Sequence, residues 1–122
     1  MIATVTLNPS LDEHILVHGL VVEETNRWVR LYRYAGDRGI DVSRAIHEMG
    51  SIATAYGFIG GPNGRAVEIL LDEEGVPSSF TPIKQETRTN FIITDTKTYP
   101  QTRIGAPSPH ISERRLERFL KK

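Results

Sequence analysis

The stretch YRYAGDRGIDVSRAIHEMG, Tyr32 to Gly50, decides the fold because its hydrophobic period changes at one point. From Trp28 to Tyr34 two sets of side chains alternate, which is typical of a strand, and both predicted faces are mixed in character. From Gly39 the apolar residues recur at helical spacing, at Val42, Ala45, Ile46 and Met49. Gly50 is then placed to end the helix. The stretch therefore predicts a mixed strand, a tight loop and a helix.

The segments around this stretch extend the same pattern. Ile2 to Leu7 and Ala53 to Phe58 read as strands. A second helix is predicted from Gly64 to Glu74, and Gly75 ends it. The residues expected to face inward on this helix are Ala66, Val67, Leu70 and Leu71. Strands that alternate with helices predict an α/β fold with a parallel sheet.

The remaining segments predict further strands and a last helix. FTPI and TRTNFIITD are strand-like, and QTRIG is a candidate returning strand. The pieces on either side of Gly19 read as a hairpin or a bent strand. Pro107 and Pro109 indicate a linker, after which Ser112 is a good N-cap. The final segment, ISERRLERFLKK, has no capping residue after it, so we expect the chain to be part of something longer.

Composition limits the classes of function. The chain of 122 residues carries 15 Lys and Arg against 15 Asp and Glu, which favours neither nucleic acid nor an anionic membrane as a partner. It contains no cysteine, which excludes disulfides and thiolate chemistry and fits a reducing, cytoplasmic setting. No apolar run is long enough to span a bilayer. His14 and His18 lie in a strand-like region, where their spacing does not favour a metal site.

The loop Gly36-Asp37-Arg38-Gly39 is the first candidate site. Its two glycines permit positive φ angles and a close approach of the backbone. The start of the following helix favours an anion, and Arg38 adds a guanidinium. It matches neither the Walker A pattern nor GxGxxG. On spacing alone, an ordinary strand-to-helix turn with two solvent-exposed charges is the simpler interpretation of the loop.

Two other segments carry candidate binding residues. Asp12 is expected just beyond a strand end, where ligands of open α/β sheets bind and where a carboxylate suits sugar hydroxyl groups. Arg88 and Asn90 alternate on one face of a predicted strand, so both can point at one ligand. The competing interpretations are an Asx-type turn for Asp12 and an ordinary polar sheet face for the other two residues.

Four segments in this order resemble the N-terminal part of the PfkB, or ribokinase-like, carbohydrate kinases. They are TVTLNPSLDEHI, AGDRGIDVSRAIHEMG, GFIGGPNGRAVEILLDEEGV and ETRTNFIITD. The resemblance is strongest to the 1-phosphofructokinase and tagatose-6-phosphate kinase branch, and it covers essentially residues 1–122. It implies a parallel βαβα core with a small β-sheet lid, in which lid strands at about 12–35 and 87–105 are inserted. A C-terminal, ATP-binding half is absent from this sequence.

The resemblance also implies roles for particular residues. Asp12 would bind sugar hydroxyl groups, and Gly36 with its loop would contact the sugar and act as a hinge of the lid. Arg88 and Asn90 would bind the phosphate of the substrate and nearby hydroxyl groups. Lid sheets in this branch often pair in a homodimer, so Val29 and Leu31 are expected to face a partner subunit.

The sequence departs from the family pattern at three positions. Asp37 and Arg38 stand where a glycine and a lysine are usual, and Asp41 replaces an asparagine. Two added carboxylates would weaken the binding of a sugar phosphate unless they are paired, and Arg38 and Arg44 are the candidates for that pairing. The departures also leave an unphosphorylated substrate or a degenerate site as alternatives.

The general base of these kinases is an aspartate of a GAGD segment, which these 122 residues do not contain. We therefore expect the substrate-binding and lid portion of a sugar or sugar-phosphate kinase, inactive alone. ATP and Mg²⁺ are expected for the complete enzyme, with none bound by this chain alone. The expected partners are a sugar or sugar phosphate and either a second copy or a C-terminal half. The alternative is a non-catalytic sugar-binding or dimerisation module.

Overall fold

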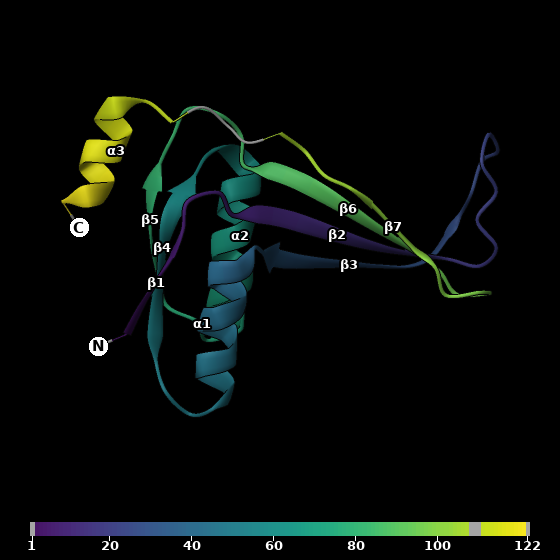
Figure 1. Ribbon diagram of the computed structural model, residues 1–122, viewed down its shortest axis with the longest axis horizontal. Coiled ribbons are helices and arrows are strands. Elements are labelled where there is room, and N and C mark those ends of the chain that lie inside the picture. Colours follow the sequence, from purple (N-terminus) through teal and green to yellow (C-terminus); the bar gives the residue numbers. More distant parts are fainter. Residues whose placement is uncertain (1, 108–110, 122) are drawn as a thin grey trace.

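The computed structural model describes residues 2–107 and 111–121, which form two β-sheets and three helices (Figure 1). Strands β1 (Ile2–Thr6), β4 (Ala53–Ile59) and β5 (Ser78–Pro82) form a three-stranded parallel sheet in the order β1-β4-β5. Figure 1 shows α1 (Arg38–Glu48) and α2 (Gly61–Glu73) on one side of this sheet and α3 (Glu113–Leu120) on the other. The α/β class and the parallel sheet predicted from the alternating pattern are confirmed.

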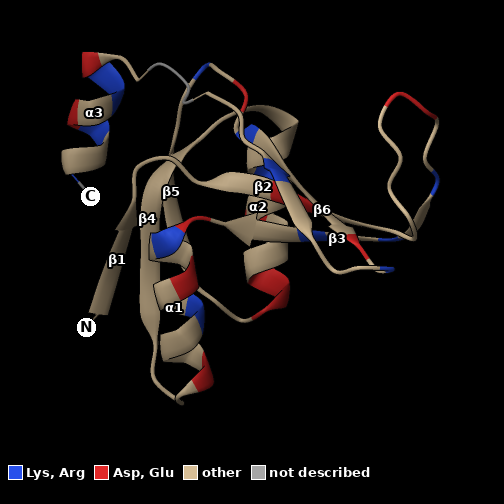
Figure 2. Cartoon of the chain, turned by 45° about the vertical axis from the view of Figure 1, so that its right-hand side comes forward, with Lys and Arg blue, Asp and Glu red and all other residues tan. Residues whose placement is uncertain are grey.

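The three-stranded sheet contains no charged residue, and its strands are uniformly tan in Figure 2. Two small residues of α1, Gly39 and Ser43, let this helix pack closely on the sheet. A Cβ at Gly39, in the first turn of α1, would clash with the Thr6 side chain and the Val5 carbonyl group. One turn later, Ser43 of α1 is fully buried and shares a hydrogen bond with Thr4 of β1. This close contact fixes the start of α1 over the end of β1.

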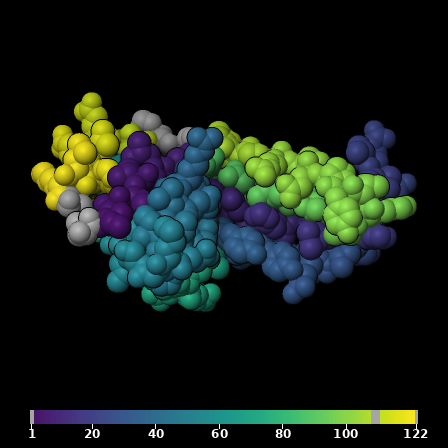
Figure 3. All heavy atoms as spheres, turned by 60° about the horizontal axis from the view of Figure 1, so that its bottom comes forward, coloured from purple at the N-terminus to yellow at the C-terminus, as the bar shows by residue number. Residues whose placement is uncertain are grey.

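A second sheet has four strands in the order β3-β2-β6-β7. They are β2 (Ser10–Val17), β3 (Trp28–Gly36), β6 (Arg88–Asp95) and β7 (Gln101–Ile104). β2 is parallel to β6 and antiparallel to β3, and β7 is antiparallel to β6. Figure 3 shows this sheet as an arm that projects from the block of core elements. The returning strand QTRIG is confirmed, whereas the predicted strand after Gly19 is wrong, because residues 20–22 contain no strand.

The alternation along the four-stranded sheet separates two faces. The register places Asp12, Tyr34 and Asn90 side by side in one row, and the next row on that face contains His14, Ile92 and Arg103. On the opposite face, Leu31, Ile15 and Ile93 form an apolar row. We call the first the polar face of the four-stranded sheet and the second its apolar face.

The core lies between the three-stranded sheet, α2 and the base of the four-stranded sheet. Val67 and Leu71 of α2 are 0% exposed, and Ala66 and Leu70 pack against the same cluster, as predicted. Leu11 of β2 and Ala35 of β3 join the cluster, so the base of the projecting sheet is anchored in the core.

Helix α1 does not bury the face that its sequence pattern predicts. Val42 is 51% exposed and Met49 is 79% exposed, while Ile40 and Ser43 are fully buried. The prediction was wrong because α1 lies over β1, a strand at the edge of the sheet, and contacts it through Gly39 and Ser43. The apolar stripe of α1 therefore faces away from the core of the described chain.

The helix ends follow the sequence more closely. Gly50 and Gly75 adopt φ angles of 84° and 75° directly after α1 and α2, as expected of C-terminal glycines. Ser112 caps α3 by accepting a hydrogen bond from the Arg115 N–H group at 3.3 Å, and the Phe119 ring packs 4.8 Å from that of Phe58. Pro107 ends the preceding described segment, and Pro109 lies outside the described residues. Among the described helices none is long and apolar enough to cross a membrane.

Candidate sugar-binding site

A cavity of about 430 Å³ lies where the polar face of the four-stranded sheet meets the start of α1. It is bounded by the ends of β2 and β3 on one side and by α1 and the C-terminal end of α2 on the other. Its polar lining residues are Asp12, His14, Tyr34, Asp41, Arg44, Glu74 and Arg103. A second hollow of about 220 Å³ shares Asp12 and Arg103 and adds Arg88 and Asn90. Asp12 therefore stands between two adjoining spaces.

Asp12 is held from two sides. Ser10 Oγ donates to Asp12 Oδ1 at 2.7 Å, and Asn90 Nδ2 donates to the same oxygen at 3.2 Å. The carboxylate also requires Gly36, because a Cβ there would overlap it. Asp12 lies inside β2 rather than beyond a strand end, so its predicted position was wrong: β2 begins directly after Pro9. The fixed carboxylate can accept hydrogen bonds from two neighbouring hydroxyl groups of a sugar.

In the loop between β3 and α1, the residue with a positive φ angle is not the one that the sequence predicts. Neither Gly36 nor Gly39 has a positive φ angle; both instead provide space, for Asp12 and Thr6 respectively. The positive φ belongs to Asp37, at φ 110° and ψ 161°. Its Oδ1 accepts a hydrogen bond from the Arg38 N–H group at 2.8 Å, which makes Asp37 the N-cap of α1. The expected close approach is correct, but the expected use of the glycines' conformational freedom is not.

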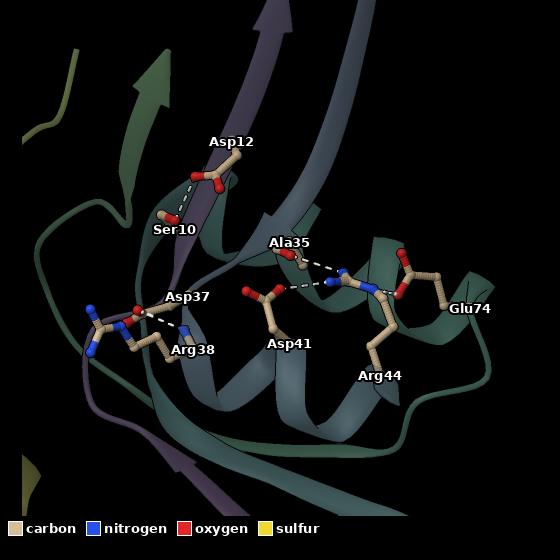
Figure 4. A network of polar contacts seen from close by, with 8 residues as sticks. All are labelled: Ser10, Asp12, Ala35, Asp37, Arg38, Asp41, Arg44 and Glu74. Atoms are coloured by element: carbon tan, nitrogen blue, oxygen red, sulfur yellow. Dashed lines mark hydrogen bonds and ion pairs between the residues drawn. The ribbon is translucent and has the colours of Figure 1, made fainter. Parts of the chain in front are cut away.

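Asp41 pairs with the Arg44 side chain, whereas Asp37 accepts a hydrogen bond from the Arg38 backbone (Figure 4). Arg44 Nη1 donates to Asp41 at 3.0 Å, Nε donates to Glu74 at 2.8 Å, and Nη2 donates to the Ala35 carbonyl group at 2.9 Å. Arg44 thus pairs with Asp41 as predicted, and it also joins α1 to α2 and to the end of β3. Burial opposes the charge of Arg44, but the hydrogen bond and charge of Glu74, followed by those of Asp41, raise its pKa.

Asp37 pairs with Arg88 rather than with Arg38. Arg88 Nη2 lies 3.7 Å from Asp37 Oδ2 and donates to the Asn8 carbonyl group at 3.0 Å. The Arg88 Nε atom is buried and has no hydrogen-bond partner among the described residues. Arg88 and Asn90 share one face of β6, as their spacing predicted, and Asn90 reaches Asp12 across the strand pair. The structure therefore gathers Asp12, Asp37, Arg88 and Asn90 around one corner of the sheet.

Sequence reasoning missed Arg103 and Glu74 as lining residues and considered His14 only as a metal ligand. Arg103 enters both hollows because β7 pairs with β6 and places it opposite Ile92. The alternation in QTRIG could have assigned it to this face once that pairing was known. Glu74 follows the last turn of α2, and only the packing of α2 beside α1 brings it to Arg44. No cluster of three or more His, Cys, Asp or Glu among the described residues could hold a metal ion.

The comparisons with known proteins agree with this fold. Residues 5–122 match the model of the pfkB family of carbohydrate kinases, and the chain belongs to this family. The described elements form the N-terminal part of a ribokinase-like fold.

The relatives it resembles include phosphofructokinases. The chain is 38% identical over 118 residues to the 1-phosphofructokinase of Borreliella burgdorferi, with 96% of this chain and 38% of that protein covered. The phosphofructokinase-2 of Escherichia coli in complex with fructose-6-phosphate superimposes with a TM-score of 0.92 at 31% identity, covering 98% of this chain and 40% of the other. A tetrameric, inhibited form of that enzyme gives a TM-score of 0.91 at 31% identity, with 98% and 40% covered. The chain therefore spans about two fifths of the length of these relatives.

Proposed function

We propose that this chain is the substrate-binding portion of a pfkB-type sugar or sugar-phosphate kinase, with the four-stranded sheet as its lid. The observation that carries the proposal is the Asp12 carboxylate, which is fixed by Ser10 and Asn90 at the mouth of a cavity between the sheet and α1. A sheet that is anchored at its base by Leu11 and Ala35 and projects beyond the core is suited to cover a sugar. Gly36, at the end of β3, is the hinge residue in this proposal.

The complete reaction would transfer the ATP γ-phosphoryl group to a sugar hydroxyl group, with Mg²⁺ neutralising charge. Among the described residues no cluster of His, Cys, Asp or Glu could hold a metal ion, and the sequence lacks the GAGD segment to which the resemblance assigns the general base. The contribution of this chain is therefore to bind and orient the sugar through Asp12 and Asn90. We propose that it does not transfer phosphate alone, which an ATP-coupled assay of the 122-residue chain tests directly.

The binding proposal is tested by calorimetry with fructose, fructose 1-phosphate, fructose 6-phosphate and tagatose 6-phosphate. Saturable binding of at least one sugar is expected, and Asp12→Ala should weaken it at least about tenfold, because hydrogen bonds to a charged group are lost. Asp72→Asn is the control of equal charge change, because this carboxylate in the last turn of α2 is exposed and lines neither hollow. Binding that is unaffected by Asp12→Ala would remove this residue from the site, and no binding of any sugar would reject the proposal.

A homodimer through the four-stranded sheet is the second proposal. Its apolar face carries Leu31, Ile15 and Ile93 in one row, and the neighbouring Val29 is 64% exposed. Sedimentation velocity of the chain should show a dimer, and Val29→Glu should shift it toward the monomer because a charge would be buried at the contact. Arg30→Glu, which lies on the polar face, is the matched control. A monomer at every concentration would support a module that binds sugar without this contact.

The exposed stripe of α1 and the open edge of β1 are the surfaces that we propose for association with a C-terminal half. Val5 of β1 is 57% exposed and Met49 of α1 is 79% exposed, although both are apolar. Mixing this chain with a C-terminal segment of a relative and measuring complex formation tests this proposal. Met49→Glu should weaken the complex, and an unchanged affinity would place the contact elsewhere.

A further inference from the structure

The loop residue Asp37 adopts a backbone conformation that is otherwise almost confined to glycine. Its angles of φ 110° and ψ 161° lie in the region where a Cβ atom is strained. Asp37 is one of three non-glycine residues with positive φ in the described chain, together with Glu23 and Tyr99. It differs from these two in standing directly beside Gly36, where the candidate sugar-binding cavity begins. The backbone conformation at position 37 therefore disfavours any side chain, and yet the residue there is an aspartate.

The strained backbone directs the Asp37 carboxylate onto the charged side chain of β6. One oxygen caps α1 through the Arg38 N–H group, while the other lies 3.7 Å from Arg88 Nη2. The exposed fractions of the two side chains are 30% for Asp37 and 20% for Arg88, so the pair is only partly screened by water. Arg88 is the residue to which the family resemblance assigns the phosphate of a substrate.

The two adjoining hollows offer little unpaired positive charge to replace Arg88. Besides Arg88, which lines only the smaller hollow, their linings contain two guanidinium groups and the carboxylates of Asp12, Asp41 and Glu74. One of these, Arg44, is already bound to Asp41, Glu74 and the Ala35 carbonyl group. Arg103 is the other, on the exposed strand β7. With Arg88 paired to Asp37, Arg103 is the only lining guanidinium group that forms no ion pair with a carboxylate among the described residues, and a doubly charged phosphate would find little else to neutralise it.

We propose that Asp37 is a specificity-determining residue, which neutralises Arg88 from within and makes this site select an unphosphorylated sugar over a sugar phosphate. The inference rests on the proposed sugar-binding function and names its substrate class. The Asp37 carboxylate has two effects. It forms an ion pair with the Arg88 guanidinium group, and it repels the negative charge of an incoming phosphate. A neutral sugar needs no free guanidinium group and is not repelled by the Asp37 carboxylate. It can still form hydrogen bonds with Asp12 and Asn90.

The test is calorimetry of the 122-residue chain with fructose and with fructose 6-phosphate at one fixed salt concentration. The native chain should bind fructose more tightly. Asp37→Asn keeps the size and a capping oxygen but removes the charge, and it should raise the affinity for fructose 6-phosphate about tenfold or more, as expected for removing a like charge at this range. The affinity for fructose should stay within about twofold. Asp37→Gly, which suits the positive φ, should give the same change without dependence on the side-chain cap.

Two further variants separate a charge effect from other causes. Asp72→Asn removes one negative charge from an exposed side chain in the last turn of α2 that lines neither hollow, and it should leave both affinities unchanged. Arg88→Ala combined with Asp37→Asn should abolish the gain for fructose 6-phosphate, because the released guanidinium is its source.

The outcomes distinguish this inference from the proposal on which it rests. A native chain that prefers fructose 6-phosphate, or variants at Asp37 that do not strengthen its binding, would overturn the role of Asp37 and leave the sugar-binding function standing. A folded chain that binds neither probe, with or without Asp37, would reject both. Circular dichroism of each variant establishes that the chain is folded before its affinity is compared.

Discussion

Helices α1 and α2 lie on the same side of the three-stranded sheet, yet they use their apolar residues differently (Figure 1). In α2, Val67 and Leu71 are fully buried between the two sheets. In α1, Val42 and Met49 are largely exposed, and the contact with the sheet is made by Ile40, Ser43 and the bare backbone of Gly39. Both sequences show a helical hydrophobic period, so the period indicates that a face is apolar without indicating which neighbour covers it.

The difference follows from where each helix lies. α2 contacts β4 and β5 and also the bases of β2 and β3, so elements surround its apolar face. α1 contacts mainly β1, the edge strand, and less extensively β4 and the end of β3, while Val42 and Met49 stay exposed. Small residues then dominate the α1 contact because they allow the helix to approach the strand closely.

The largest expected effect comes from truncating one apolar residue in each helix. Leu71→Ala in α2 should lower the free energy of unfolding by about 2–5 kcal/mol, because it leaves a cavity in a fully packed core. Met49→Ala in α1 should change it by no more than about 0.5 kcal/mol, since that side chain is 79% exposed. Urea unfolding followed by circular dichroism measures both. Equal losses would show that the stripe of α1 is buried in solution, for example by a second copy.

A glycine substitution tests the close contact of α1 with β1. Gly39→Ala should cost about 1–3 kcal/mol of stability, because the added methyl group would overlap the Thr6 side chain and lies 2.8 Å from the Val5 carbonyl oxygen. The control is Gly105→Ala, where the nearest atom to the new methyl group is Asn90 Oδ1 at 3.8 Å and no positive φ interferes. If both variants unfold at the same urea concentration, Gly39 does not pack closely against Thr6 and Val5 in solution.

The sequence predicts the elements better than it predicts their neighbours. The period of α2 and the shared face of Arg88 and Asn90 follow from local alternation, which depends only on the repeat of each element. Three other features depend on which strands pair and where a sheet ends. They are the exposure of the apolar stripe of α1, the position of Asp12 inside β2 and the position of Arg103 in the lining of the cavity. The strained Asp37 and its contact with Arg88 join segments distant in the chain, and no local pattern encodes them.

The smallest expected effect concerns the ion pair that joins the two helices. A double-mutant cycle of Arg44→Ala and Glu74→Ala should give a coupling of about 0.5–1 kcal/mol, because the side chains are 24% and 31% exposed and their atoms lie 2.8 Å apart. The cycle removes the separate contribution of the Arg44 bond to the Ala35 carbonyl group. The parallel cycle with Asp41→Ala should give less than half of this coupling, since Asp41 is 65% exposed and lies on the same helix as Arg44. A Glu74 coupling no larger than the Asp41 coupling would show that the bond between the helices stabilises the fold no more than the bond within α1.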